Sequence, residues 1–204
     1  MNPCASTRRR LGPFAVALAL AALCPIARAD LQDDLNARWR GAWVVITGEV
    51  YSNCNGLTTD NRISGDLIMG SGREAFAPGE LARVSKVDAK RHRVDVMLDI
   101  AEPVLIEYQD GPFTLYREAS CPIELLVDFG DERTKDLGVA GVETQFDLWL
   151  ERYARLEDAE LSASWNRRER ADYPDDYEQT LAAYEDWKVE QHNQLVAQRT
   201  EDCS

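Results

Sequence analysis

The chain has 204 residues and carries 36 Asp and Glu residues against 23 Lys and Arg residues, which gives a formal net charge of −13 at neutral pH. Its hydrophobic content of 45% is enough for a folded core and excludes disordered tails and collagen-like chains. A negative field of this size repels nucleic acids and anionic lipids, so we set aside the nucleic-acid-binding proteins as a class.

Residues 1–29 have the features of a secretory signal peptide. Arg8, Arg9 and Arg10 precede the apolar run Leu11 to Leu23, and Ala27 and Ala29 place small residues at the −3 and −1 positions. The apolar run is short for a membrane anchor. We therefore expect cleavage after Ala29, a secreted or periplasmic location, and no transmembrane segment in the mature chain, whose formal charge becomes −17.

Residues 30–130 predict an antiparallel β domain, because apolar residues recur with a period near two from residue 40 onward. The clearest alternation lies between His92 and Ile100, and shorter versions follow Ala42, Val104 and Ile123. Turn signals such as Asn55-Gly56 and Asp110-Gly111-Pro112 separate these runs. Six or seven short strands linked in this way indicate a small antiparallel barrel or sandwich.

Residues 131–204 predict a helical region packed on the β domain, which makes the whole chain α+β. One apolar stripe with helical spacing contains Val142, Phe146, Trp149, Leu150, Tyr153 and Leu156. A second helix is expected from Pro174, because Asp175, Asp176 and Glu178 would stabilise its first turn. We interpret the region as a C-terminal helical hairpin of two or three helices.

The mature chain keeps three cysteines, which in an oxidising compartment favour one disulfide and one leftover thiol. Cys54 and Cys121 both lie in the strand-rich region, so we predict that they form the disulfide. Cys203 stays open to three interpretations: it is free, it competes for one of the other cysteines, or it links two chains.

No catalytic, cofactor-binding or metal-binding residue is predicted, and no cofactor is expected. His92 and His192 are the only imidazoles, and neither has a nucleophile at the spacing of a known motif. Two acidic clusters lack the spacing of a calcium loop; they are Asp128, Asp131 and Glu132, and Asp172, Asp175 and Asp176.

The strongest positive feature surrounds a predicted hairpin turn at Asp88-Ala89. We treat it as a weak interaction patch, and its members are Lys86, Lys90, Arg91, His92 and Arg93. Such a patch could contact an acidic partner, a phosphate-bearing lipid head group, or the acidic helices of its own fold.

The hypothesis that best fits these features is a non-catalytic binding or envelope-interaction module. The acidity of the chain favours a basic envelope protein as its partner, since opposite charge speeds association. The first alternative is a hydrolase of cell-envelope polymers that uses carboxylates alone. The second is a structural dimer joined by a disulfide between two copies of Cys203.

Overall fold

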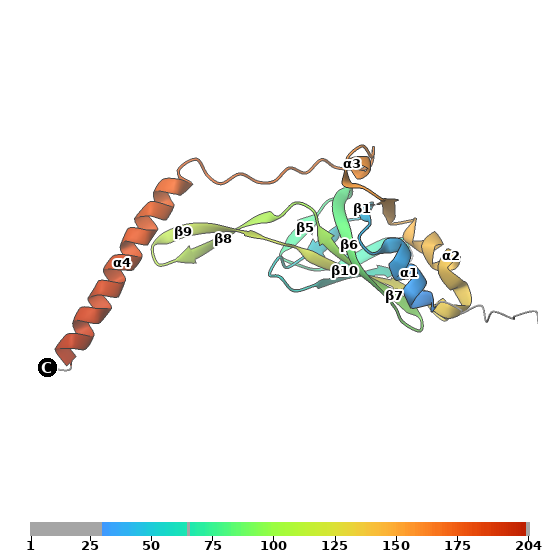
Figure 1. The fold of residues 1–204 in the computed structure, drawn as a ribbon, viewed down its shortest axis with the longest axis horizontal. Coiled ribbons are helices and arrows are strands. Elements are labelled where there is room, and N and C mark those ends of the chain that lie inside the picture. Colours follow the sequence, from blue (N-terminus) through green and yellow to red (C-terminus); the bar gives the residue numbers. More distant parts are fainter. Residues whose placement is uncertain (1–29, 65, 203–204) are drawn as a thin grey trace, which may run out of the picture.

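The computed structural model describes residues 30–64 and 66–202, which form an α+β fold (Figure 1). The signal peptide predicted for residues 1–29 and the thiol of Cys203 lie outside the described residues. The elements in chain order are α1 (Leu31–Trp39), β1 (Trp43–Ile46), β2 (Val50–Ser52), β3 (Thr59–Ser64), β4 (Leu67–Gly70), β5 (Glu74–Phe76), β6 (Glu80–Ala89), β7 (Arg93–Ile100), β8 (Val104–Asp110), β9 (Phe113–Ala119), β10 (Pro122–Asp128), α2 (Thr134–Phe146), β11 (Leu150–Tyr153), α3 (Leu156–Ala159) and α4 (Tyr177–Asp202).

A curled seven-stranded sheet forms the body of the protein, with the strand order β11-β1-β6-β7-β10-β3-β4 (Figure 1). All neighbouring pairs are antiparallel except β10 and β3, which run parallel with Ile123 opposite Thr59. The sheet is therefore mixed, and the predicted fully antiparallel arrangement is only partly right. Two smaller antiparallel pairs stand beside it, β2 with β5 and β8 with β9.

A disulfide lies close to the start of both parallel strands. The sulfur atoms of Cys54 and Cys121 lie 2.11 Å apart, in agreement with the predicted pairing. Each cysteine precedes one of the two strands, so β3 and β10 leave the same covalent bridge in the same direction. Parallel strands need a long crossover, and the 67 residues that separate the cysteines contain β4 to β9.

The inner face of the curled sheet is the hydrophobic core. In β7 the alternation expected from the sequence holds only in part. Val94, Val96 and Leu98 are fully buried and Asp99 is exposed, but Asp95, which was expected in water, is buried. Helices α1 and α2 cover this face, and the rings of Trp39 and Phe146 meet edge to face at 4.9 Å. Helix α1 was not expected from the sequence, because its nine residues give a weak apolar period.

The predicted C-terminal helical hairpin is not found within residues 131–202, all of which the structure describes. Helix α2 ends at Phe146, and Leu150–Tyr153 forms strand β11 on the open edge of β1, with Leu150 opposite Ile46. The unpaired backbone of an edge strand offers hydrogen bonds that outweigh a helical apolar period. After the short α3, an extended segment leads to helix α4, which lies apart from the other helices (Figure 1).

None of the helices between residues 30 and 202 combines the length and the hydropathy that crossing a bilayer requires.

Candidate functional site

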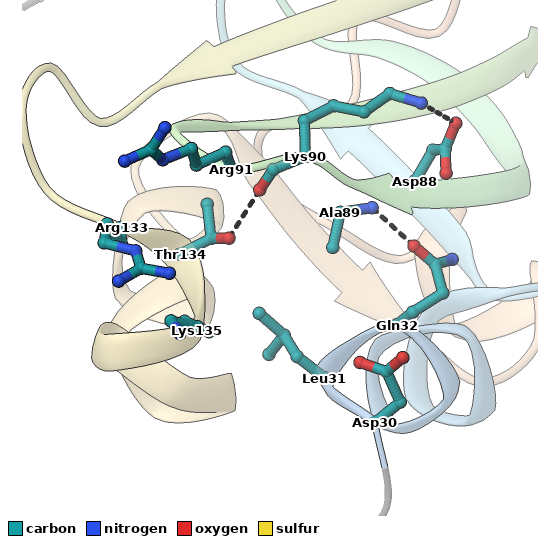
Figure 2. A pocket seen from close by; sticks show the side chains of 10 residues that line it. All are labelled: Asp30, Leu31, Gln32, Asp88, Ala89, Lys90, Arg91, Arg133, Thr134 and Lys135. Atoms are coloured by element: carbon teal, nitrogen blue, oxygen red, sulfur yellow. Dashed lines mark hydrogen bonds and ion pairs between the residues drawn. The ribbon is translucent and has the colours of Figure 1, made fainter.

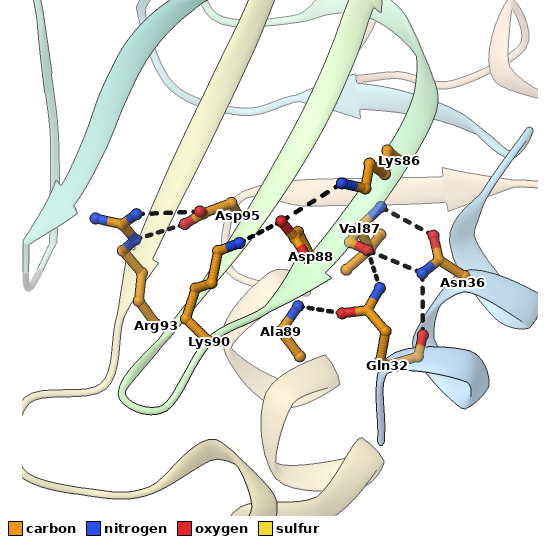
Figure 3. Close-up of polar contacts among 9 residues, drawn as sticks. All are labelled: Gln32, Asn36, Lys86, Val87, Asp88, Ala89, Lys90, Arg93 and Asp95. Atoms are coloured by element: carbon orange, nitrogen blue, oxygen red, sulfur yellow. Dashed lines mark hydrogen bonds and ion pairs between the residues drawn. The ribbon is translucent and has the colours of Figure 1, made fainter. Parts of the chain in front are cut away.

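The basic patch predicted around the β6–β7 turn is largely neutralised by the protein itself. The carboxylate of Asp88 forms ion pairs with the ammonium groups of Lys86, at 3.4 Å, and of Lys90 (Figure 3). The guanidinium of Arg93 lies 2.5 Å from the carboxylate of Asp95. The hydrogen bond from Lys90 is the main reason why the pKa of Asp88 is lowered. Lys86, Lys90 and Arg93 are therefore engaged in internal ion pairs.

The other two members of the patch lie in the turn itself, which spans residues 90–92 rather than Asp88-Ala89. The backbone N–H of Lys90 donates to the carbonyl of Arg93 at 2.8 Å and closes the turn. The Nδ1 atom of His92 lies 3.0 Å from the carbonyl oxygen of Glu132. In the part of the chain that the structure describes, the guanidinium of Arg91 has no carboxylate within 4.0 Å.

Arg91 lines an open cavity of about 500 Å³ that the sequence does not reveal. Figure 2 shows the three segments that build it: the start of α1, the end of β6 with its turn, and the start of α2. The lining residues, named here the basic cavity, are Asp30, Leu31, Gln32, Asp88, Ala89, Lys90, Arg91, Arg133, Thr134 and Lys135. Arg133 and Lys135 thus join Arg91 and Lys90 although they lie far away in the sequence.

A buried threonine fixes the two basic segments relative to each other. The hydroxyl of Thr134 donates to the carbonyl of Lys90 at 2.5 Å, and its backbone N–H donates to the carbonyl of Arg91 at 3.0 Å (Figure 2). Thr134 is 3% exposed. These two hydrogen bonds therefore connect the start of α2 to the backbone of the turn. They fix the backbone positions from which the side chains of Arg133 and Lys135 extend.

Two side-chain amides of α1 hold the opposite wall. Asn36 and Gln32 are four residues apart on one face of the helix, and both bond to the backbone of β6 (Figure 3). Gln32 donates to the carbonyl of Val87 and accepts from the N–H of Ala89, each at 2.5 Å. The end of β6, which has no pairing with β1 there, is thus completed by α1.

Comparison with protein-family models, curated proteins and solved structures gives no match to this chain. The site must be interpreted from its own chemistry.

A second feature lies at the other end of the molecule, where α4 stands beside the β8–β9 hairpin and away from the large sheet (Figure 1). Aromatic rings form the contact: Phe113 meets Tyr184 at 5.7 Å and Trp187 at 5.8 Å, and Tyr116 meets Tyr177 at 5.5 Å. We name the hairpin (residues 104–119) together with residues 171–202 the acidic arm.

Hydrogen bonds fix α4 in register with the hairpin. The hydroxyl of Tyr177 donates to the carbonyl of Tyr116 at 2.9 Å, and the hydroxyl of Tyr184 donates to the carboxylate of Asp110 at 2.5 Å. This bond to Asp110 is the main reason why the pKa of Tyr184 is raised to about 12. Gly111, at the hairpin tip, has a positive φ of 58°, and a Cβ there would lie 2.5 Å from Trp187.

The arm carries a large share of the negative charge of the protein. Residues 171–202 contain nine Asp and Glu residues against Lys188 and Arg199 alone. Glu178, Glu185, Asp186 and Glu190 are exposed on α4, as are the apolar side chains of Leu181 and Val189. The acidic arm therefore lies at one end of the molecule, and α1 and α2, whose first residues line the basic cavity, lie at the other end (Figure 1).

A carboxylate-dependent hydrolase would need two neighbouring acids, and Asp30 and Asp88 both line the basic cavity. Burial and the charges of Asp95 and Asp60 raise the pKa of Glu124, which lies on the outer face of the sheet. Glu124 lines neither the basic cavity nor the hollow beside Glu80. Among the described residues, no group of three or more His, Cys, Asp or Glu side chains could hold a metal ion.

Proposed function

We propose that this protein is a non-catalytic binding module that uses its acidic arm to bind a basic surface of a partner protein. The observation that carries the proposal is the arm itself. The β8–β9 hairpin and the 26-residue helix α4 extend away from the large sheet (Figure 1). They contact each other through a small group of aromatic side chains, which leaves most of α4 exposed.

The chemistry of the exposed surface selects the partner. A row of carboxylates attracts a basic protein at long range and speeds association, while apolar side chains next to the charges supply contact area once the partners meet. Leu181 and Val189, which are 41% and 61% exposed, lie among the acids of α4 and fit this second role.

The compartment that we propose is the periplasm or the outside of the cell. The Cys54–Cys121 disulfide supports an oxidising environment, because such bonds are rare in the cytosol. The signal peptide predicted for residues 1–29 and the acidity of the chain agree with a protein that meets basic envelope proteins there.

Two charge variants with the same change in net charge test the proposal. The arm variant is Glu185→Gln, Asp186→Asn and Glu190→Gln, and the control variant is Asp60→Asn, Asp66→Asn and Asp99→Asn in the exposed body. Each protein is incubated with the envelope fraction at low salt, eluted with high salt, and the eluted partner is purified for an affinity measurement.

We expect a basic partner that elutes with salt, since screening weakens exposed charge pairs. Its affinity should fall about tenfold or more for the arm variant, which is a loss of about 1.4 kcal/mol, and should stay near the wild-type value for the control. An equal loss of affinity in both variants would show that the binding depends on net charge alone and not on the arm. The absence of a partner at both salt concentrations would contradict the proposal.

A further inference from the structure

The basic cavity is lined by more cations than carboxylates. Four cations line it, Lys90, Arg91, Arg133 and Lys135, against the two carboxylates of Asp30 and Asp88. Asp88 is already shared between Lys86 and Lys90. Arg133 reaches Asp136 only at 3.9 Å, and within residues 30–64 and 66–202 no carboxylate lies within 4.0 Å of the charged groups of Arg91 or Lys135.

This concentration of cations is unusual in a chain with so large an excess of acids. Repulsion between the basic groups costs free energy unless an anion offsets it. Elsewhere in the protein, acidic side chains form ion pairs with neighbouring arginines: Asp95 with Arg93, and Asp158 with Arg155. Around the cavity, backbone bonds through Thr134 hold two basic segments together instead of separating them.

The shape and the remaining lining define the chemical class of the ligand. Guanidinium groups match the oxygens of a phosphate with paired hydrogen bonds, and an ammonium group adds a point charge. Leu31 and Ala89 provide an apolar wall, and the carboxylate of Asp30 at the rim can accept a hydrogen bond from a hydroxyl group (Figure 2). A volume of about 500 Å³ suits a small molecule.

We propose that the basic cavity binds the phosphate group of a small hydroxylated phosphoester. Arg91, Arg133 and Lys135 hold the phosphate, and the wall formed by Leu31 and the rim at Asp30 contact the rest of the molecule. The same phosphate chemistry occurs in a soluble phosphoester and in the head group of a phospholipid, and the experiment separates these two sources. The proposal does not depend on the function proposed for the acidic arm.

The test uses the full chain and three probes: glycerol 3-phosphate, glycerol, and vesicles containing phosphatidylglycerol. Binding of the soluble probes is measured by calorimetry and by chemical shifts of the backbone amides, and binding to vesicles by sedimentation. The site variant is Arg91→Gln with Arg133→Gln, and the control variant is Arg62→Gln with Arg117→Gln. All four arginines are exposed or half-buried, so each variant removes two similar charges.

We expect glycerol 3-phosphate, but not glycerol, to bind and to shift the amides of residues 89–91 and 133–135. The site variant should bind at least tenfold more weakly, and the control should bind within about twofold of wild type. Vesicle binding that the site variant alone loses, without binding of the soluble probe, would support the cavity as a head-group site. Equal losses in both variants, or no binding of any phosphate probe by a folded protein, would overturn the proposal.

Discussion

The side-chain amide of Asn36 is hydrogen-bonded to both backbone polar groups of Val87. Its Oδ1 accepts from the N–H of Val87 at 3.1 Å, and its Nδ2 donates to the carbonyl of Val87 at 2.9 Å (Figure 3). Asn61 binds the backbone of Tyr51 in the same way, at 2.7 and 2.9 Å. In both places an amide side chain takes the position that a neighbouring strand would occupy.

We therefore expect Asn36→Ala to destabilise the protein by about 2 kcal/mol. Val87 is fully buried, and its N–H would lose the hydrogen bond to Asn36, whereas its carbonyl would keep Gln32. Denaturant unfolding measures the loss. Asn193→Ala, at an exposed position of α4, is the matched control and should change the stability little; equal losses would show that the amide has no special role.

The buried carboxylate of Glu80 depends on Arg168. Arg168 donates to Glu80 through Nε at 2.8 Å and to the carbonyl of Glu102 at 2.6 Å, and Asn166 donates to the second oxygen of Glu80 at 3.2 Å. Glu80 is only 2% exposed, so loss of the guanidinium would leave a buried charge without its ion-pair partner. We expect Arg168→Ala to lower the free energy of unfolding by about 3 kcal/mol.

The double variant Glu80→Gln with Arg168→Met distinguishes a lost charge pair from lost packing. It removes the buried charge together with its partner, so it should recover a large part of the stability that Arg168→Ala loses. A double variant as unstable as Arg168→Ala would contradict this account. Arg117→Ala, which changes an exposed arginine of β9, should have little effect.

Loss of the Cys54–Cys121 disulfide should destabilise the protein by about 4 kcal/mol, because the bond closes a loop across 67 residues and restricts the unfolded chain. The measurement compares wild type with Cys54→Ala and Cys121→Ala in denaturant. Peptide mapping without reductant should recover the linked pair, and a peptide that joins Cys203 to either residue would contradict it. Cys203→Ser should leave the stability unchanged.

The attachment of α4 should weaken at alkaline pH. The pKa of Tyr184 is raised to about 12, from an ordinary value of 10.0, because its hydroxyl donates to Asp110. The folded arm therefore holds this proton more tightly than the unfolded chain does. The resulting stability is fully present below pH 10 and is lost as the pH rises from 10 to 12.

Ultraviolet titration of the tyrosines tests this prediction in wild type and Asp110→Asn. The variant should bring the titration of Tyr184 back toward the ordinary range, and hydrogen exchange of α4 should then be faster at neutral pH. Glu107→Gln, which removes an acid next to Tyr116 instead, is the control. Identical titration curves for wild type and Asp110→Asn would contradict the assigned hydrogen bond.

The sequence predicted those parts of the fold that depend on local pattern. Strand β7 was visible because Val94, Val96 and Leu98 share one face, and the disulfide because a chain predicted to be exported has few cysteines to pair. Strand β11 was mistaken for helix because its strand character comes from the free edge of β1. The α+β class and a helix after Pro174 were therefore evident, whereas the mixed sheet and the separation of α4 from the other helices were not.

The candidate site was predictable only in part, for the same physical reason. Lys90 and Arg91 are neighbours at a turn and stood out as a charge cluster. Arg133 and Lys135 reach the same cavity through the contacts of Thr134 with the β6–β7 turn, and no spacing in the sequence reports such a contact. The internal pairing of Lys86, Lys90 and Arg93 likewise depends on the register of β6 and β7.

Asp30 lies at the rim of the basic cavity, and it is also the residue at which the mature chain is predicted to start. Cleavage after Ala29 would convert a neutral peptide group at this rim into an α-amino group, which ordinarily has a pKa of about 8 and is mostly protonated at neutral pH. Cleavage would also remove Arg28, two residues before Asp30, so it would exchange one cation for another rather than add one. The charge next to Asp30 in the processed chain would then be a terminal amino group, which titrates near neutral pH, whereas a guanidinium stays charged.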